Sequence, residues 1–154
     1  MIDHTIVKGQ GYRHSMKGPA GDDGVDYTKS FPIGIHEDEL WINIALSGEM
    51  WTRVGNRKAC ISYGILRLKI IDQAGNVVDE IIDRKGTYLY EGALTETFHL
   101  NASSFLPLKK GVYTFQVEAQ CLTSITGRPC DIENIDFRYM AVGISPVNPV
   151  GFPA

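Results

Sequence analysis

Apolar and polar residues alternate most clearly over residues 112–121, directly after a turn-forming Leu-Pro-Leu-Lys-Lys-Gly segment. A period of two is typical of an extended chain with one face against a core. The residues that share the apolar face are Tyr113, Phe115, Val117, Ala119 and Cys121. The pattern predicts a strand that is buried on one side.

Three further segments show the same period, at residues 40–47, 61–71 and 135–144. Residues 72–75 read Asp-Gln-Ala-Gly, which suits a type I turn and predicts a hairpin with the segment that follows. Other short segments bring the expected total to seven or eight strands, and no long helical stripe is present. We therefore predict an all-β fold, an antiparallel two-sheet β-sandwich.

The residues that open the strand at 112–121 predict a tight bend. Gly111 lies two positions before Tyr113, so the chain can turn there and the phenol can reach back to the upstream backbone. This arrangement resembles the tyrosine corner of immunoglobulin-like and fibronectin-type sandwiches, although no cysteine follows Tyr113 by two residues. The resemblance implies an immunoglobulin-like sandwich with Gly111 and Tyr113 as structural residues, and it implies no function. An antiparallel hairpin with a buried tyrosine is the open alternative.

The chain has 154 residues, of which 44% are hydrophobic and 21% are charged. These values predict one folded domain over residues 1–154. Residues 8–32 are rich in glycine and show little periodicity, so they are expected to form a flexible segment. Residues 145–154 contain three prolines and are expected to form a tail.

The formal net charge of −3 leaves no basic surface for nucleic acid. No apolar run reaches the length of a membrane-spanning helix, so membrane insertion is not expected. The first residues lack the features of a signal peptide, which leaves two readings: a cytoplasmic protein, or a mature exported form whose Met1 is not native.

The three cysteines bear on that choice. Cys121 and Cys130 bracket an eight-residue loop at the end of the strongest strand, and we expect a disulfide between them. Cys60 is then a small buried side chain, although a bridge between Cys60 and Cys121 and three free thiols stay open as alternatives. A bridge favours a periplasmic or secreted location, and its absence favours the cytoplasm.

The sequence contains no recognised catalytic motif, and its four histidines are far apart. We therefore expect no enzyme, no cofactor and no metal site. The acidic turn at Asp22 and Asp23 resembles a calcium-binding loop in its glycine spacing, but it lacks the full ligand pattern and is expected to be a solvated turn.

The first functional hypothesis is a non-catalytic protein-interaction module of the bacterial cell envelope or a secreted setting, with a toxin-neutralising or assembly role included. Recognition is usually placed on loops of a rigid sandwich, which here means residues 8–32 and 122–129. The candidate binding residues are Arg128, Thr126, Asp22 and Asp23. Arg128, at the expected loop tip, is the leading candidate because a planar donor on a constrained loop loses little entropy on docking.

The second hypothesis is a carbohydrate-binding sandwich that stacks sugar rings on exposed aromatic side chains. The candidates for this platform are Trp41, Trp51, Tyr88 and Tyr90. The side chains and strand edges that face the solvent distinguish the two hypotheses. Solvent-facing rings on a common platform favour carbohydrate, whereas a flat apolar patch or an open edge strand favours a protein partner.

Overall fold

The computed structural model describes residues 4–53, 58–92 and 95–142, and every regular element in them is a β-strand. The strands are β1 (His4–Ile6), β2 (Gly11–Met16), β3 (Ala20–Asp22), β4 (Gly24–Thr52), β5 (Cys60–Asp72), β6 (Val77–Leu89), β7 (Glu96–Thr123) and β8 (Pro129–Val142). Among these residues, none forms a helix of the length and apolarity that crossing a membrane requires. The predicted tail at residues 145–154 lies outside the described residues.

The eight strands form one hydrogen-bonded sheet with the order β2-β8-β4-β7-β5-β6. Neighbours along this path are antiparallel. Two short strands lie off the path: β1 pairs in parallel with β4, and β3 pairs with β8.

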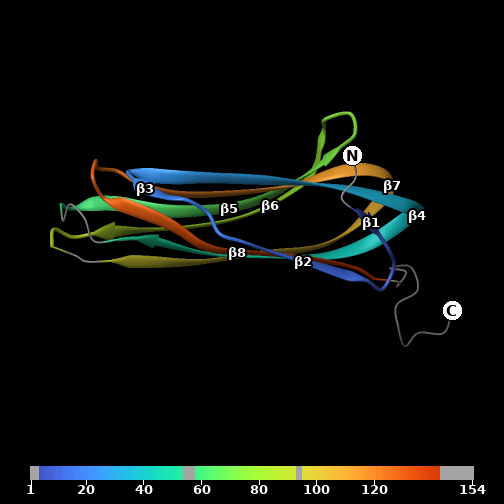
Figure 1. Cartoon of the computed structure of the whole chain (residues 1–154), viewed down its shortest axis with the longest axis horizontal. Coiled ribbons are helices and arrows are strands. Elements are labelled where there is room, and N and C mark those ends of the chain that lie inside the picture. The colour runs from blue at the N-terminus through green and yellow to red at the C-terminus, as the bar shows by residue number, and fades with distance from the viewer. Residues whose placement is uncertain (1–3, 54–57, 93–94, 143–154) are drawn as a thin grey trace.

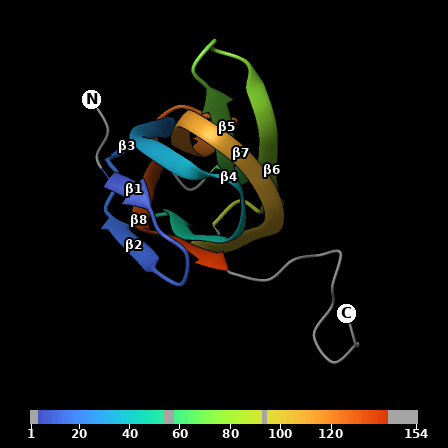
Figure 2. The same cartoon turned by 90° about the vertical axis from the view of Figure 1, so that its right-hand side faces the viewer.

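The two longest strands, β4 and β7, run through both layers of the molecule and bend together at one end (Figure 1). Residues 24–35 of β4 pair with residues 111–122 of β7, and residues 39–52 pair with residues 96–109. The register shifts between Ile35 and Glu39, where the chain turns the corner. The first half of β4 with the second half of β7, β5 and β6 forms the upper layer. The second half of β4 with the first half of β7, β8 and β2 forms the lower layer (Figures 1 and 2).

The predicted all-β, antiparallel fold is confirmed. The expected core strands at residues 40–47, 61–71 and 112–121 lie within longer strands, and the fourth is a strand up to Val142, with residues 143–144 outside the described residues. Residues 101–104, which read Asn-Ala-Ser-Ser, also lie inside β7. These small or polar side chains alternate between exposed and partly buried positions, so the strand continues there without an apolar signature. The finer assignment to the immunoglobulin type stays a prediction, since that fold has two sheets of separate strands.

The expectation of a flexible segment at residues 8–32 is wrong for most of its length. Residues 11–16 form β2 along β8, and β4 begins at Gly24. The inward-facing residues of β2 are Tyr12, His14 and Met16. Only one of these is a plain apolar residue, so the alternation is weak in the sequence although the strand is paired over its full length.

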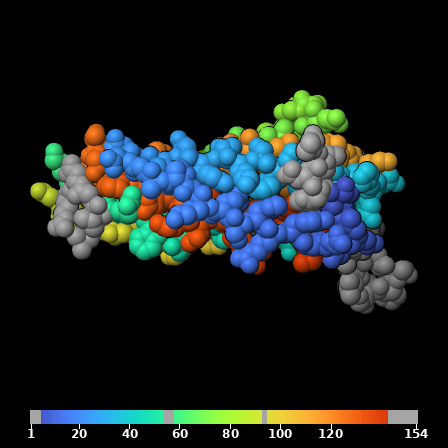
Figure 3. Space-filling model, viewed as in Figure 1, coloured from blue at the N-terminus to red at the C-terminus, as the bar shows by residue number. Residues whose placement is uncertain are grey.

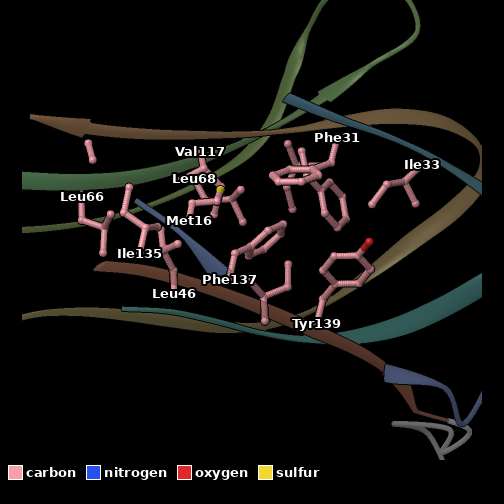
Figure 4. Close-up of a cluster of buried hydrophobic side chains, with 14 of the residues drawn as sticks. Met16, Phe31, Ile33, Leu46, Leu66, Leu68, Val117, Ile135, Phe137 and Tyr139 are labelled. Carbon is pink, nitrogen blue, oxygen red and sulfur yellow. The ribbon is translucent and has the colours of Figure 1, made fainter. Parts of the chain in front are cut away.

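The core lies between the two layers, where side chains from both halves of the sheet interdigitate (Figure 4). The residues at its centre include Phe31, Leu46, Leu66, Leu68, Val117, Phe137 and Tyr139. Three of them form an aromatic cluster, with ring centroids 5.6 Å apart between Phe31 and Phe137 and 5.1 Å apart between Phe137 and Tyr139. This packing joins β4 and β8 across the interior.

The bend of β7 contains the predicted tyrosine corner. The Tyr113 hydroxyl donates a hydrogen bond to the carbonyl oxygen of Lys109 at 2.8 Å, and its ring is buried. Gly111, between them, has a φ of 155°, a conformation that side chains rarely adopt. Burial raises the pKa of Tyr113 above its usual value, so the phenol stays protonated and keeps its role as a donor.

We expect Tyr113→Phe to lower the free energy of unfolding by about 1 kcal/mol, because the partly buried hydrogen bond to the Lys109 carbonyl is lost. Chemical denaturation measures the effect. The matched control is Tyr63→Phe, which removes a hydroxyl from a half-exposed ring on β5. Equal denaturation midpoints for Tyr113→Phe and the parent protein contradict a stabilising role for the corner.

Candidate functional site

The leading loop candidate, Arg128, is fully buried, with 0% of its surface exposed. The expectation that it forms an exposed loop tip is therefore wrong. The connection after β7 is short, because β7 continues to Thr123 and β8 begins at Pro129. Backbone bonds fold the connection onto the neighbouring turn, where the N–H of Asp23 donates to the Arg128 carbonyl at 3.2 Å. Arg128 is thus a structural residue.

The other loop candidates lie at the surface. Asp22, Asp23 and Thr126 are exposed. Asp23 has a φ of 69° and accepts a hydrogen bond from the Gly127 N–H on its Oδ1 at 2.5 Å. It therefore holds the loop at residues 124–128 in place. Within residues 4–53, 58–92 and 95–142, no group of three His, Cys, Asp or Glu side chains lies close enough to hold a metal ion.

The predicted bridge between Cys121 and Cys130 is absent, since Cys60, Cys121 and Cys130 are all buried free thiols. Cys121 pairs with residues of the upper layer, whereas Cys130 pairs with Thr52 of the lower layer, so their side chains meet across the core. A hydrogen bond with Cys130, together with burial, raises the pKa of Cys121 and keeps it a neutral thiol. A periplasmic or secreted location loses the observation that motivated it and stays a prediction.

The four aromatic candidates separate into two places. Trp41 and Trp51 lie on the outer face of the lower layer. Side chains of a strand alternate between its two faces, and the buried Ile42 and Ile44 occupy the inner face of β4. Ten residues of strand separate them by roughly 30 Å. Tyr88 and Tyr90 belong instead to the end of the β5–β6 hairpin. No single platform contains all four.

The outer face of β4 between the two tryptophans forms the floor of a groove, which we call the β4 groove. Its floor residues are small or short, and they are Asn43, Ala45 and Ser47. The register places longer residues of β7 and β8 beside them. Asn43 lies between Phe105 and Met140.

The hollows along this face measure about 340, 340 and 220 Å³. The first two share Ala45 and Arg138, and the last two share Ser47, Asn101 and Asp136. The β4 groove is therefore continuous along the strand. Its shape is long and shallow rather than enclosed.

One end of the groove has an apolar platform. The Trp41 and Phe105 rings pack at 4.8 Å between centroids, and Phe105 and Met140 are each 47% exposed. Large apolar side chains with half of their surface in water are a signature of binding surfaces when they gather beside a concavity. Because the platform comes from three neighbouring strands, the sheet itself holds it in place.

The other end of the groove is polar. The Trp51 Nε1–H donates to Glu49 Oε1 at 3.0 Å, and Glu49 Oε2 lies 3.7 Å from His99 Nδ1. These contacts orient the indole and the carboxylate on the surface of the sheet. The groove thus offers stacking surfaces near both ends and hydrogen-bonding groups between them.

A second surface feature is an exposed apolar group at one end of the β5–β6 hairpin, which we call the tyrosine patch. Ile61 lies directly opposite Tyr88, and Tyr63 follows on the same face. The Tyr88 and Tyr90 rings are 55% and 73% exposed and meet edge to face, with an angle of 85° between their planes. Perpendicular rings form a ridge, not a flat platform.

Sequence reasoning missed Phe105, Met140, Arg13 and Arg138 as members of the β4 groove. The spacing of ten residues between Trp41 and Trp51 in one strand is a signal that both face the same side. The other residues come from strands far away in the sequence, so only the pairing of β2, β7 and β8 with their neighbours brings them together.

No protein-family model matches the chain, and no curated protein matches it. Several solved structures are similar to this chain. A CocE/NonD family hydrolase from Staphylococcus aureus is 10% identical with a TM-score of 0.41, over 90% of this chain and 34% of the hydrolase. Tailspike protein 4 of bacteriophage CBA120 is 12% identical with a TM-score of 0.35, over 86% of this chain and 19% of the tailspike protein. The chain thus spans about a third or less of these two proteins.

A family 6 carbohydrate-binding module is similar over 94% of this chain and 99% of the module, at 13% identity and a TM-score of 0.27.

Proposed function

We propose that this protein is a non-catalytic module that binds a linear carbohydrate along the β4 groove. The observation that carries the proposal is the row of outward-facing residues on β4, with a tryptophan at each end and a floor of small or short residues between them.

The chemistry of this row suits a sugar chain. Sugar rings have apolar faces that stack on aromatic side chains, and Trp41 with Phe105 supplies such a surface. Hydroxyl groups need both donors and acceptors, which the amides of Asn43 and Asn101 and the carboxylate of Glu49 provide. An open groove of this length accommodates an extended chain, whereas small ligands favour enclosed pockets.

The absence of catalysis is part of the same proposal. The groove contains two carboxylates, Glu49 and Asp136, and glycoside hydrolysis needs such a pair. Glu49 is bound by Trp51 and His99, and Asp136 is bound by two arginines. Carboxylates held by these partners serve as positioning groups, so we assign them to binding.

A protein partner is the second candidate, and the tyrosine patch favours it. Tyrosine is enriched at protein interfaces because it combines apolar area with a polar tip. At the opposite end of the β5–β6 hairpin, its tip stands out from the body of the molecule, and Val77 and Val78 beside the tip are exposed (Figure 3). The tyrosine patch replaces residues 8–32 and 122–129 as the place where a protein is expected to dock.

A binding panel with a steric variant tests the proposal. The ligands are soluble oligosaccharides derived from cellulose, xylan and galacturonan, long enough to reach both tryptophans. We expect the parent protein to bind at least one of them and Ala45→Tyr to bind it at least tenfold more weakly, because the new ring fills the floor of the groove. Ala45 is exposed, so the substitution leaves the core intact.

The control variant is Tyr88→Ala, which removes an exposed ring from the tyrosine patch and is expected to leave oligosaccharide binding unchanged. Equal affinity of the parent and Ala45→Tyr contradicts the assignment to the β4 groove. Loss of binding in Tyr88→Ala alone moves the site to the hairpin.

A further inference from the structure

Two arginines face each other across adjacent strands at one wall of the β4 groove. Arg13 of β2 and Arg138 of β8 are directly opposite in the register. Like charges in this position destabilise a sheet, so a fold selected for stability alone has no reason to place them together. Both side chains project into water, with 64% and 61% of their surface exposed.

A single carboxylate holds the pair. Asp136 Oδ1 accepts a hydrogen bond from Arg13 Nε at 2.9 Å, and Asp136 Oδ2 lies 3.2 Å from Arg138 Nε. Asp136 is itself largely buried, with 18% of its side chain exposed. The three residues carry a net charge of +1. Asp136 meets each guanidinium at its Nε, and more than half of each arginine side chain stays in water, so both guanidiniums are accessible to a ligand.

The arginines belong to the groove and not to a separate surface. Arg13 and Arg138 line the same hollow as Asn43, Ala45 and Met140. The register sets Ala45 of the floor directly beside Arg138. A sugar unit that lies on the floor at Ala45 therefore has its edge next to the exposed guanidinium groups.

We infer that Arg13, Arg138 and Asp136 form a subsite for the carboxylate of a uronic acid unit, which makes an acidic polysaccharide the preferred ligand. Guanidinium groups match planar carboxylates with two parallel N–H donors each, and charge-assisted hydrogen bonds of this kind are stronger than those between neutral groups. Asp136 fixes the two guanidiniums before the ligand arrives, so little side-chain freedom is lost on binding. The inference rests on the proposed function and names the ligand class of the same groove.

Isothermal titration with a galacturonan-derived oligosaccharide and with its fully methyl-esterified form tests this subsite, since esterification removes the charge of each carboxylate and adds only a methyl group. We expect the parent protein to bind the acid at least tenfold more tightly than the ester. The preference is expected to disappear in Arg13→Gln/Arg138→Gln and to shrink in about 1 M salt, where charges are screened within about 3 Å. The matched control, Arg84→Gln on the exposed side of β6, is expected to keep the preference.

Asp136→Asn keeps both arginines and removes one negative charge beside them, so it is expected to keep the preference for the acid over the ester. The double arginine substitution is expected to lose this preference. A change at Asp136 that preserves it shows that the loss in the double variant does not come from misfolding of this part of the sheet. Equal binding of acid and ester by the parent overturns the subsite while the carbohydrate function stands. A preference that persists in the double variant also overturns it, and binding of neither form overturns both the subsite and the carbohydrate function.

Discussion

Phe137→Ala is expected to lower the free energy of unfolding by about 3–5 kcal/mol, the range for deleting a large buried ring. Phe137 has no exposed surface and packs against Phe31, Phe115 and Tyr139 from the two layers. Small domains are stable by only about 5–15 kcal/mol, so the loss removes a large fraction of the total. Urea denaturation followed by tryptophan fluorescence measures it as a lower midpoint.

Phe105→Ala is the matched control, because it deletes the same ring from the opposite face of the same layer. Phe105 is half-exposed, so we expect a cost of about 1 kcal/mol, chiefly from its contact with Trp41. The same variant is expected to weaken carbohydrate binding. Similar midpoints for the two variants contradict a core that lies between the layers.

Trp41→Ala is expected to weaken oligosaccharide binding by about 2 kcal/mol, or roughly thirtyfold in affinity. Trp41 forms the apolar platform with Phe105, and its removal leaves the first sugar unit without a stacking surface. Isothermal titration with the tightest ligand of the panel gives the change.

Trp41→Phe separates stacking from a general loss of structure. A smaller ring retains part of the platform, so its affinity is expected to fall between those of the parent and Trp41→Ala. Unaltered binding by Trp41→Ala, in a variant whose circular dichroism matches the parent, contradicts a platform at this end of the groove.

The strands of this fold follow from local patterns wherever one face is fully apolar. Residues 112–121 and 40–47 each place only apolar or aromatic residues on one face, and both are strands in the structure. Gly111 and Tyr113 also predict the corner correctly, since its hydrogen bond spans only four residues. Local sequence determines such features because the interacting groups are close along the chain.

The length of the strands and the course of β2 depend on distant partners. β4 and β7 continue through the bend because each pairs with the other on both sides of it. β2 is held by β8, more than a hundred residues away, so its own weak alternation is sufficient for a strand. Arg128 is buried for a similar reason, because the turn at Asp23 closes over its connection.

In the candidate site, too, some features follow from local sequence and others depend on distant strands. The common face of Trp41 and Trp51 is readable from their spacing in one strand. The position of Arg13 beside Arg138 is not, because it depends on the register between two strands at opposite ends of the sequence. A platform that also included Tyr88 and Tyr90 was expected from residue type alone, and the topology places these tyrosines elsewhere.

The most direct test of the carbohydrate assignment is a backbone amide NMR titration with the galacturonan-derived oligosaccharide and, if it does not bind, the tightest ligand of the panel. The account predicts shifts that follow one strip of the surface, over residues 41–51 of β4, 99–105 of β7 and 136–140 of β8, with Tyr88 and Tyr90 unaffected. Shifts confined to the β5–β6 hairpin or to residues 122–129, or no shifts with any oligosaccharide, contradict it.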